Sequence, residues 1–313
     1  MYKKYFSKFL TANKDLLHFS CHSHHYWPDC SREAQLEYWD DSAKYVDDKW
    51  NYIFSNKIPK LQQQIGKVLG LSAYDNITFA PNTHELVYRL ISALEASQPS
   101  KKLRILTTDS EFYSFDRQIN RLEEVDKVSV TKVALEPFST FEQRFIEESL
   151  NSYDMVFVSH VFFNSAKSIS DLTNFVERIE NDTIVIDGYH AFMALPTDLS
   201  KIENKIFYIA GSYKYSAGGE GCCFMVSPKD CELKPINTGW FAELGDLTNS
   251  DESQVKFSTG GLRFAGATMD FSCLYRQSAV FELYEKENIT VQNIHTHVRK
   301  NQERLLSQIK DSD

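Results

Sequence analysis

The feature of this sequence that most constrains its fold is a series of seven short apolar or β-branched runs, each bounded by polar or turn residues. Amphipathic stretches long enough for helices, such as 84–96 and 138–150, separate most of these runs. Strands that alternate with helices indicate an α/β domain with a mainly parallel sheet. The sequence therefore predicts a seven-stranded sheet flanked by helices, with strands at 77–80, 104–108, 127–134, 155–160, 183–187, 206–211 and 221–226.

The two flanks of the chain differ from this central part. Residues 29–50 have an aromatic-rich helical pattern, and residues 265–310 predict one or two helices. No internal repeat or Pro/Gly-rich linker separates the parts. We therefore predict a large domain at 52–235 and a smaller domain built from 1–51 and 236–313. The chain is expected to end within this small domain, which would then be incomplete.

Composition excludes several broad classes of protein. The formal net charge of the 313 residues is −9, which argues against a general surface for nucleic acid or anionic membranes. No segment approaches the roughly 18 uninterrupted apolar residues of a membrane span, and the first residues do not form a signal peptide. The six cysteines form no CxxC pair, which favours reduced thiols over a disulfide scaffold. These features predict a cytoplasmic protein.

Reactive or ionisable side chains stand at the ends of two predicted strands. The run 183–187 ends in Asp187, with His190 three residues further on, and the run 206–211 is followed by Lys214. Alone, the aspartate could be a turn or cap residue and the lysine a surface residue. The two positions are 214 − 187 = 27 residues apart, which fits one helical crossover between neighbouring strands. Ligands of open α/β sheets bind at the carboxyl ends of such strands.

A lysine and an acid at this edge match the needs of pyridoxal 5′-phosphate (PLP). This cofactor needs a lysine for its aldehyde, an acid for its pyridinium nitrogen, a ring to stack on and donors for its phosphate. Asn82 and Thr83 stand at a predicted helix start. The free N–H groups there can bind an anion such as phosphate, or the two residues can simply cap the helix. Phe112, after the second strand, is either a stacking ring or a core aromatic residue.

In this order, the motifs resemble the class V aminotransferase family of fold-type I PLP enzymes, and among its members kynureninase. The resemblance covers the chain from about residue 15 and includes the run Ser212-Tyr213-Lys214-Tyr215. It implies that Lys214 forms the Schiff base (an internal aldimine) and moves protons, with Tyr213 as a further catalytic residue. It also implies that Asp187 pairs with the pyridinium nitrogen and that His190 lies beside the ring. Phe112 would stack on the ring, and Asn82, Thr83, Ser212 and Tyr213 would hold the phosphate end of the cofactor.

Two later segments resemble parts of this family that reach the cofactor of a second subunit. They are Gly239-Trp240-Phe241 and the run from Arg263 to Thr268. The resemblance implies that Trp240 and Thr268 bind the cofactor of a partner subunit. The expected assembly is therefore a homodimer with cofactor sites at the interface, acting on a small amino acid.

The sequence leaves several classes of reaction possible. The resemblance favours kynureninase-like C–C hydrolysis or β-elimination, with an aminotransferase or a cysteine/selenocysteine lyase as alternatives. The substrate-carboxylate arginine of the family belongs to a C-terminal segment that this chain is expected to lack. A truncated, catalytically silent PLP-binding homologue is therefore a third reading.

Histidines and cysteines add one further candidate region. His22, His24 and His25 lie near Cys21 and Cys30, but adjacent residues seldom converge on one metal ion. A loop over the cofactor or an aromatic packing segment is the preferred interpretation, and no metal site is predicted. Cys222 and Cys223 fall in a strand run and are expected in the core.

Overall fold

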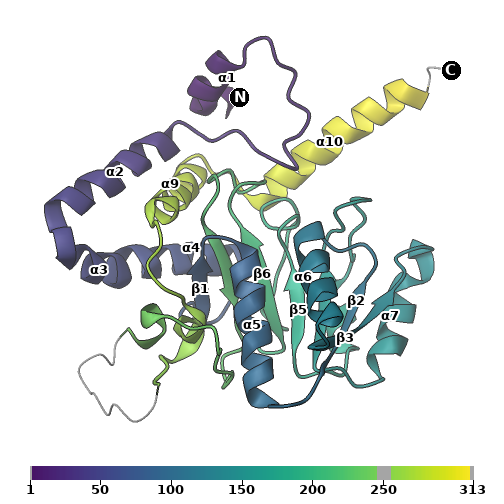
Figure 1. Cartoon of the computed structure of the whole chain (residues 1–313). Coiled ribbons are helices and arrows are strands. Elements are labelled where there is room, and N and C mark those ends of the chain that lie inside the picture. Colours follow the sequence, from purple (N-terminus) through teal and green to yellow (C-terminus); the bar gives the residue numbers. More distant parts are fainter. Residues whose placement is uncertain (1, 245–254, 311–313) are drawn as a thin grey trace.

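The computed structural model describes residues 2–244 and 255–310, and its centre is the predicted seven-stranded sheet (Figure 1). The strand order is β1-β7-β6-β5-β4-β2-β3. The predicted α/β fold with a mainly parallel sheet is therefore confirmed. The strands are β1 (Ile77–Ala80), β2 (Leu103–Thr108), β3 (Val128–Val133), β4 (Met155–Ser159), β5 (Ile184–Asp187), β6 (Ile206–Gly211) and β7 (Cys223–Val226).

Strand direction brings the chemically interesting residues to one edge of the sheet. The pairs β2–β3, β2–β4, β4–β5 and β5–β6 are parallel, whereas β7 runs antiparallel to both β6 and β1. The carboxyl ends of β4, β5 and β6 therefore meet at one edge. In register, Asp187 of β5 lies beside Ser159 of β4 and Ile209 of β6.

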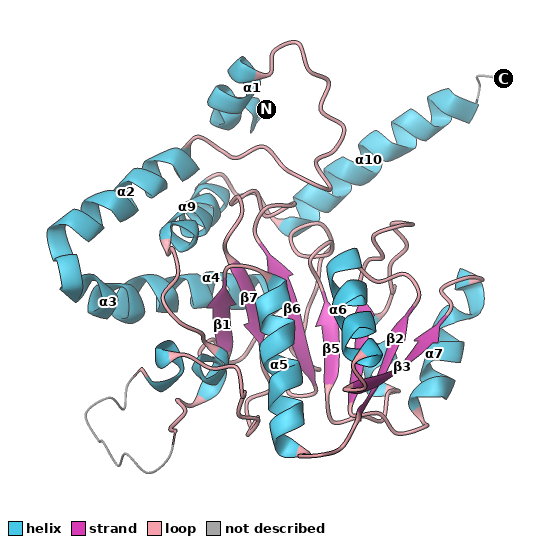
Figure 2. Ribbon diagram, in the orientation of Figure 1, coloured by secondary structure: helices cyan, strands magenta, loops and turns pink. Residues whose placement is uncertain are grey.

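Helices cover both faces of the sheet (Figure 2). The sheet separates two clusters of core residues, one on each face. α5 (Thr83–Ser97) and α6 (Tyr113–Glu124) pack on one face, with Leu86 and Leu90 of α5 fully buried. The other face of the sheet packs against the larger of the two core clusters. The helices that contribute to it include α4 (Ile58–Leu69), α7 (Phe141–Ser149), α8 (Leu172–Glu177) and α9 (Ser272–Lys286).

The amino-terminal and carboxy-terminal flanks pack against each other through α2 (Cys30–Tyr45) and α9. The phenolic hydroxyl of Tyr275 donates a hydrogen bond to Asp41 at 2.9 Å, and the Tyr275 ring meets Tyr38 edge to face. α2 ends at Val46, which has φ 49°, and α3 (Lys49–Tyr52) follows. The flanks do combine, while the domain boundaries at 51 and 236 stay a prediction.

The connection between β5 and β6 differs from the sequence expectation. Residues 189–194 and 200–205 form turns joined by an irregular stretch, instead of the predicted crossover helix. Successive turns close through Phe192 N to Gly188 O at 2.7 Å and Leu195 N to Ala191 O at 2.8 Å. Pro196 follows directly and cannot continue a helix. The parallel β5–β6 pairing that the spacing predicted is nevertheless present.

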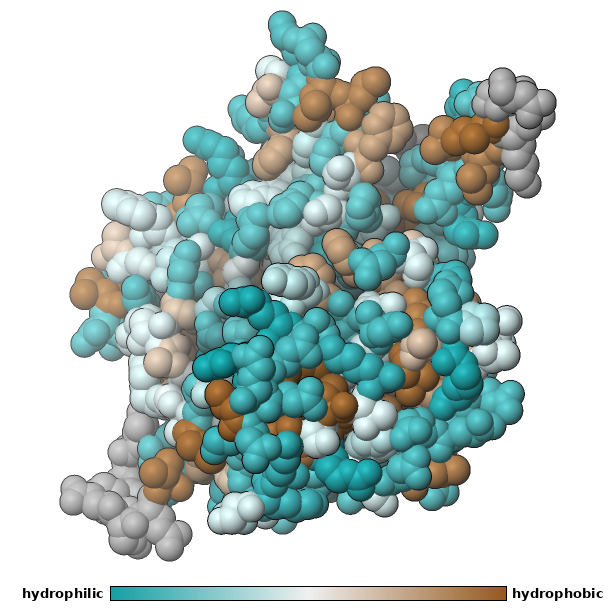
Figure 3. Space-filling view, turned by 45° about the vertical axis from the view of Figure 1, so that its right-hand side comes forward, coloured by the Kyte–Doolittle hydropathy of each residue, from teal (hydrophilic) through white to brown (hydrophobic). Residues whose placement is uncertain are grey.

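The surface carries apolar side chains at the outer end of α10 (Val291–Lys310), which projects from the body of the molecule (Figures 1 and 3). Leu305, Leu306 and Ile309 are about half exposed there. Within residues 2–244 and 255–310, no helix is long and apolar enough to cross a membrane.

Candidate active site

A cavity of about 260 Å³ opens at the carboxyl ends of the central strands, between the start of α5 and the segment after β6. Its volume is close to the lower end of small-molecule pockets, roughly 300–1,000 Å³. Seven of the ten residues predicted for the site lie in its lining: Asn82, Thr83, Phe112, Asp187, His190, Tyr213 and Lys214.

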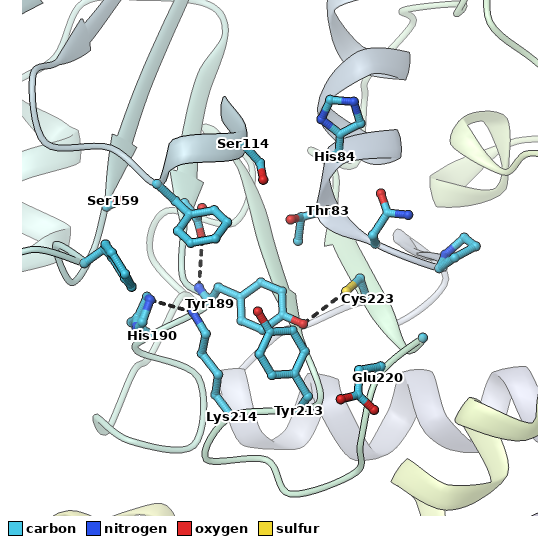
Figure 4. Close-up of a pocket in the computed structure, with 16 residues that line it drawn as sticks. Thr83, His84, Ser114, Ser159, Tyr189, His190, Tyr213, Lys214, Glu220 and Cys223 are labelled. Carbon is cyan, nitrogen blue, oxygen red and sulfur yellow. Dashed lines mark hydrogen bonds between the residues drawn. The ribbon is translucent and has the colours of Figure 1, made fainter. Parts of the chain in front are cut away.

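Lys214 lies three residues beyond β6, and its side chain points toward His190 (Figure 4). The residue is only 5% exposed, and its Nζ lies 2.5 Å from His190 Nε2. Nζ also lies 4.6 Å from the centre of the Tyr189 ring and 5.5 Å from that of Phe112. Burial lowers the pKa of Lys214 to about 8, although the charge of Asp187 opposes this shift. The amine is therefore a usable nucleophile near neutral pH.

Asp187 is the last residue of β5 and lines the same cavity. Its Oδ1 accepts a hydrogen bond from the backbone N–H of Tyr189 at 2.9 Å. Burial raises the pKa of Asp187, while that N–H and the charge of Lys214 lower it. The carboxyl therefore shares the cavity with the lysine amine, as the spacing of the two residues predicted.

His190 is neutral in this environment. Burial lowers its pKa to about 3, and the charges of Lys214 and His22 act in the same direction. A neutral imidazole has one ring nitrogen free to accept a hydrogen bond. We assign Nε2 as the acceptor and the Lys214 ammonium as the donor, since a charged lysine has no acceptor.

The start of α5 forms the opposite side of the cavity. Asn82 is the N-cap, and its Oδ1 accepts the Glu85 N–H at 2.9 Å, so this side-chain oxygen is already engaged. Thr83 is the first helical residue, and His84 next to it also lines the cavity. The Thr83 hydroxyl and the positive end of this helix are a suitable site for an anionic group.

The segment that carries Lys214 is held in shape by backbone hydrogen bonds and by a buried arginine. Gly218 N donates to Ser212 O at 2.8 Å, and Ala217 N donates to Lys214 O at 2.9 Å. Arg276 of α9 donates to the carbonyls of Gly218 at 3.2 Å and Glu220 at 2.5 Å. Arg276 thus supports the segment that follows Lys214.

Gly219 in this turn has no room for a side chain. Its φ is +74°, and a Cβ would lie 2.6 Å from the Trp27 ring. We expect Gly219→Ala to destabilise the protein by about 2–4 kcal/mol, because a left-handed backbone penalty adds to an overlap with a packed ring. Denaturant unfolding of the variant should show this loss. A stability equal to that of the wild type would contradict the tight packing of Trp27 on the turn.

The amino-terminal histidine segment docks on the residue before the lysine. The His24 ring stacks on Tyr213 with centroids 5.0 Å apart, and His25 N donates to Tyr213 O at 3.1 Å. Tyr213 lines the cavity, whereas His24 and His25 do not. Among the residues that the structure describes, no group of three or more His, Cys, Asp or Glu side chains is arranged to hold a metal ion.

Three predicted residues lie outside the cavity of this single chain. The Ser212 hydroxyl is buried and donates a hydrogen bond to Gly219 O. The hydroxyl proton that was predicted to bind phosphate is therefore already engaged. Trp240 and Thr268 lie together elsewhere, joined by a hydrogen bond from Trp240 Nε1 to Thr268 Oγ1 at 3.1 Å. Both were predicted to serve a partner subunit, and that role stays a prediction.

Sequence reasoning missed several residues at the cavity. Ser159 ends β4 and was within reach of the strand-end argument that found Asp187. Tyr189 and Cys223 meet beside the lysine, with Tyr189 Oη 3.4 Å from Cys223 Sγ. The prediction that Cys222 and Cys223 are buried is confirmed, but Cys223 also lines the cavity. Glu220 and His84 follow a glycine turn and a cap, where the sequence carries no distinctive signal.

Residues 36–313 match the model of the family described as Aminotransferase class-V. The chain belongs to the class V aminotransferase family. This membership supports PLP as the cofactor, because enzymes of this class use it. Among curated proteins, none matches the chain.

Solved structures share the fold at low sequence identity. A mutant of C-DES with glycine covalently linked to its PLP cofactor has a TM-score of 0.77 and 16% identity, over 93% of this chain and 76% of that chain. The cystine C–S lyase C-DES in complex with its product cysteine persulfide has a TM-score of 0.73 and 17% identity, over 88% and 73%. A cysteine desulfurase from Thermococcus onnurineus NA1 has a TM-score of 0.78 and 16% identity, over 96% and 74%. At such identities the likeness shows the fold alone.

Proposed function

We propose that this protein is a PLP-dependent lyase that eliminates a sulfur leaving group from the β-carbon of a small, cysteine-like amino acid. The observation that carries the proposal is the joint placement of Lys214, Asp187 and His190 in one cavity. The proposal takes up the cysteine lyase reading of the sequence. The C–S lyase and the cysteine desulfurase that share the fold also favour it over C–C hydrolysis.

The residues present fit PLP by their chemistry. The Lys214 amine is poised to react with an aldehyde, and Asp187 offers a carboxylate that forms no salt bridge with a described residue. Phe112 supplies an aromatic face, and the start of α5 supplies donors for a phosphate. When bound, the cofactor accepts the electron pair left by the substrate Cα–H bond as it breaks.

The chain's own residues account for the proton movements of a β-elimination. The neutral Lys214 amine takes the Cα proton, and the sulfur leaves Cβ with the bonding electron pair. His190 accepts a hydrogen bond from Lys214 and thereby orients the amine. Asp187 holds its charge toward the cavity, where it favours a protonated ring nitrogen.

The cysteine at the cavity favours simple elimination over sulfur transfer to an enzyme thiol. Burial raises the pKa of Cys223, the cysteine that lines the cavity, to about 12. A thiol with such a pKa is a poor nucleophile at neutral pH. Cys222 and Cys273 are buried as well. Elimination needs no protein thiol, because the sulfur leaves with the substrate fragment.

A screen of amino acids against the PLP-loaded protein tests the proposal. Cysteine, cystine and selenocysteine are compared with kynurenine, 3-hydroxykynurenine and transamination pairs. Sulfide or persulfide together with pyruvate supports elimination, whereas alanine with enzyme-bound persulfide indicates sulfur transfer. Release of an aryl product from kynurenine, or amine transfer to a keto acid without sulfur release, would overturn the proposal. PLP binding without turnover of any substrate would favour the silent-homologue reading.

Kynureninase-like hydrolysis is the second candidate, and one feature of the cavity mouth favours it. Phe163 lines the cavity and is 48% exposed, with its ring 5.4 Å from Phe112 and 5.7 Å from His190. Such a ring can pack against an aryl side chain. Phe163→Ala separates the candidates, since it should impair an aryl substrate more than cysteine.

A homodimer belongs to the same proposal. Trp240 is 38% exposed and contacts Thr268 outside the cavity of its own chain. Both residues are therefore placed where a second subunit could meet them. Weakened PLP binding in Trp240→Ala, with the dimer retained in analytical ultracentrifugation, is the expected result.

The depressed pKa of Lys214 predicts how fast the cofactor attaches. Only the neutral amine attacks an aldehyde, and the pKa of about 8 fixes the neutral fraction. We expect the attachment rate to rise about tenfold per pH unit below pH 8 and to level off above it. Stopped-flow absorbance of apo-protein mixed with PLP measures this rate. A rise that continues to pH 10 would show that the amine has an ordinary lysine pKa.

A further inference from the structure

A second buried carboxyl lies near enough to Asp187 for the two charges to interact. Glu111, in the turn between β2 and α6, is only 7% exposed and is not part of the cavity lining. It accepts hydrogen bonds from Thr108 Oγ1 at 2.7 Å, from Ser159 Oγ at 2.5 Å and from Ser159 N at 3.3 Å. Glu111 thus joins the carboxyl ends of β2 and β4.

Ser159 links this carboxyl to the proposed cofactor site. It is the register partner of Asp187 in the parallel β4–β5 pair, and both residues line the cavity. Residues in register on adjacent strands project to the same face, and the strands lie about 4.8 Å apart. Glu111, Ser159 and Asp187 therefore form a row across three strand ends.

The charges around the two carboxyls are unequal. Lys214 faces Asp187 and lowers its pKa, whereas no described residue forms a salt bridge with Glu111. Tyr189, Tyr208, Tyr213 and Cys223 also lie near Asp187 and are neutral at pH 7 because burial raises their pKa values. His190 in the same cavity is neutral because burial lowers its pKa. Two buried like charges this close are unfavourable, so one carboxyl is the natural place for a proton.

We propose that Glu111 is a positioning residue that holds a proton beside Asp187 and acts through Ser159, so that Asp187 remains the charged carboxyl that faces the cavity. The proposal rests on the proposed function only in giving Asp187 a cofactor partner. When Glu111 is protonated, its hydroxyl donates to Ser159 Oγ. The Ser159 hydroxyl is then free to donate its own proton to the next acceptor in the row, which is Asp187. Burial, with help from the charge of Asp187, raises the pKa of Glu111 to about 7, although its hydrogen bonds with Ser159 and Thr108 oppose this.

Infrared difference spectra of the apo-protein test where the proton resides. A buried protonated carboxyl gives its own carbonyl stretching band, so we expect this band at pH 6 and its loss at pH 8.5. It should be absent in Glu111→Gln and retained in Glu124→Gln, the same chemical change on the exposed surface of α6. A wild type without the band at pH 6, or a band that persists in Glu111→Gln, would overturn the proposal.

Binding of PLP at pH 6 gives the second readout. Glutamine mimics the protonated acid, so Glu111→Gln should bind PLP within about threefold of the wild type. Asp187→Asn should bind at least about 30-fold more weakly, because it removes the charged partner itself. Equal losses in the two variants would overturn the proposal. A wild type that does not bind PLP would refute the proposed function, while the infrared result would still decide the state of Glu111.

Discussion

Replacing Lys214 with alanine should lower the rate of product release from the best amino-acid substrate at least about 1,000-fold. The change removes both the amine that holds the cofactor and the group that takes the Cα proton. It also removes the hydrogen bond to His190. The visible absorbance of lysine-linked PLP should disappear as well.

Two controls make the Lys214 result specific. Lys229→Ala alters an exposed lysine just after β7 and should leave turnover unchanged. Lys214→Arg keeps a positive charge but lacks a nucleophilic amine, so it should fail like the alanine variant. Circular dichroism should show that both Lys214 variants stay folded. Turnover in Lys214→Ala above a tenth of the wild-type rate would rule out the proposed role.

The sheet could be predicted from the sequence because its signals are local. Each strand is a short apolar run, and no predicted end differs from the observed one by more than two residues, as at β3 (Val128–Val133). The direction of β7 could not be predicted, because a fully buried strand has no pattern that distinguishes parallel from antiparallel pairing. The prediction of a helix between β5 and β6 was wrong. The segment is long enough for a helix, but it forms local turns, and Pro196 does not allow a helix to continue.

Cavity residues were predictable where they stand at or just after the end of a strand, as with Asp187 and Lys214. They were not predictable where function depends on contacts between distant segments. Glu111 stands next to Phe112 in the sequence, but its partner Ser159 is 48 residues away. Arg276 supports the lysine segment across 58 residues. Ser212 lies outside the cavity lining, and its hydroxyl donates a hydrogen bond to the nearby backbone carbonyl of Gly219.

Stability of the apo-protein should depend on pH through Glu111. Its pKa is about 7 in the folded state, above the ordinary value of 4.5. A raised pKa means that the folded state holds the proton more tightly than the unfolded chain. The contribution of Glu111 is therefore fully present below pH 4.5 and is lost as the pH rises to 7. At 1.36 kcal/mol per unit, the loss over this window is about 3 kcal/mol.

Glu111→Gln should abolish this dependence, because an amide keeps hydrogen-bonding groups for Ser159 and Thr108 but does not ionise. The stability difference between wild type and variant should therefore shift by about 3 kcal/mol in favour of the variant between pH 4.5 and 7.5, and stay constant above that. Urea unfolding of the two apo-proteins across this range measures the difference, with Glu124→Gln expected to follow the wild type. A difference that does not change with pH would mean that Glu111 has the same pKa in the folded and unfolded states and is ionised at neutral pH. Asp187 would then have to take the proton, since both buried carboxyls cannot stay charged at low cost.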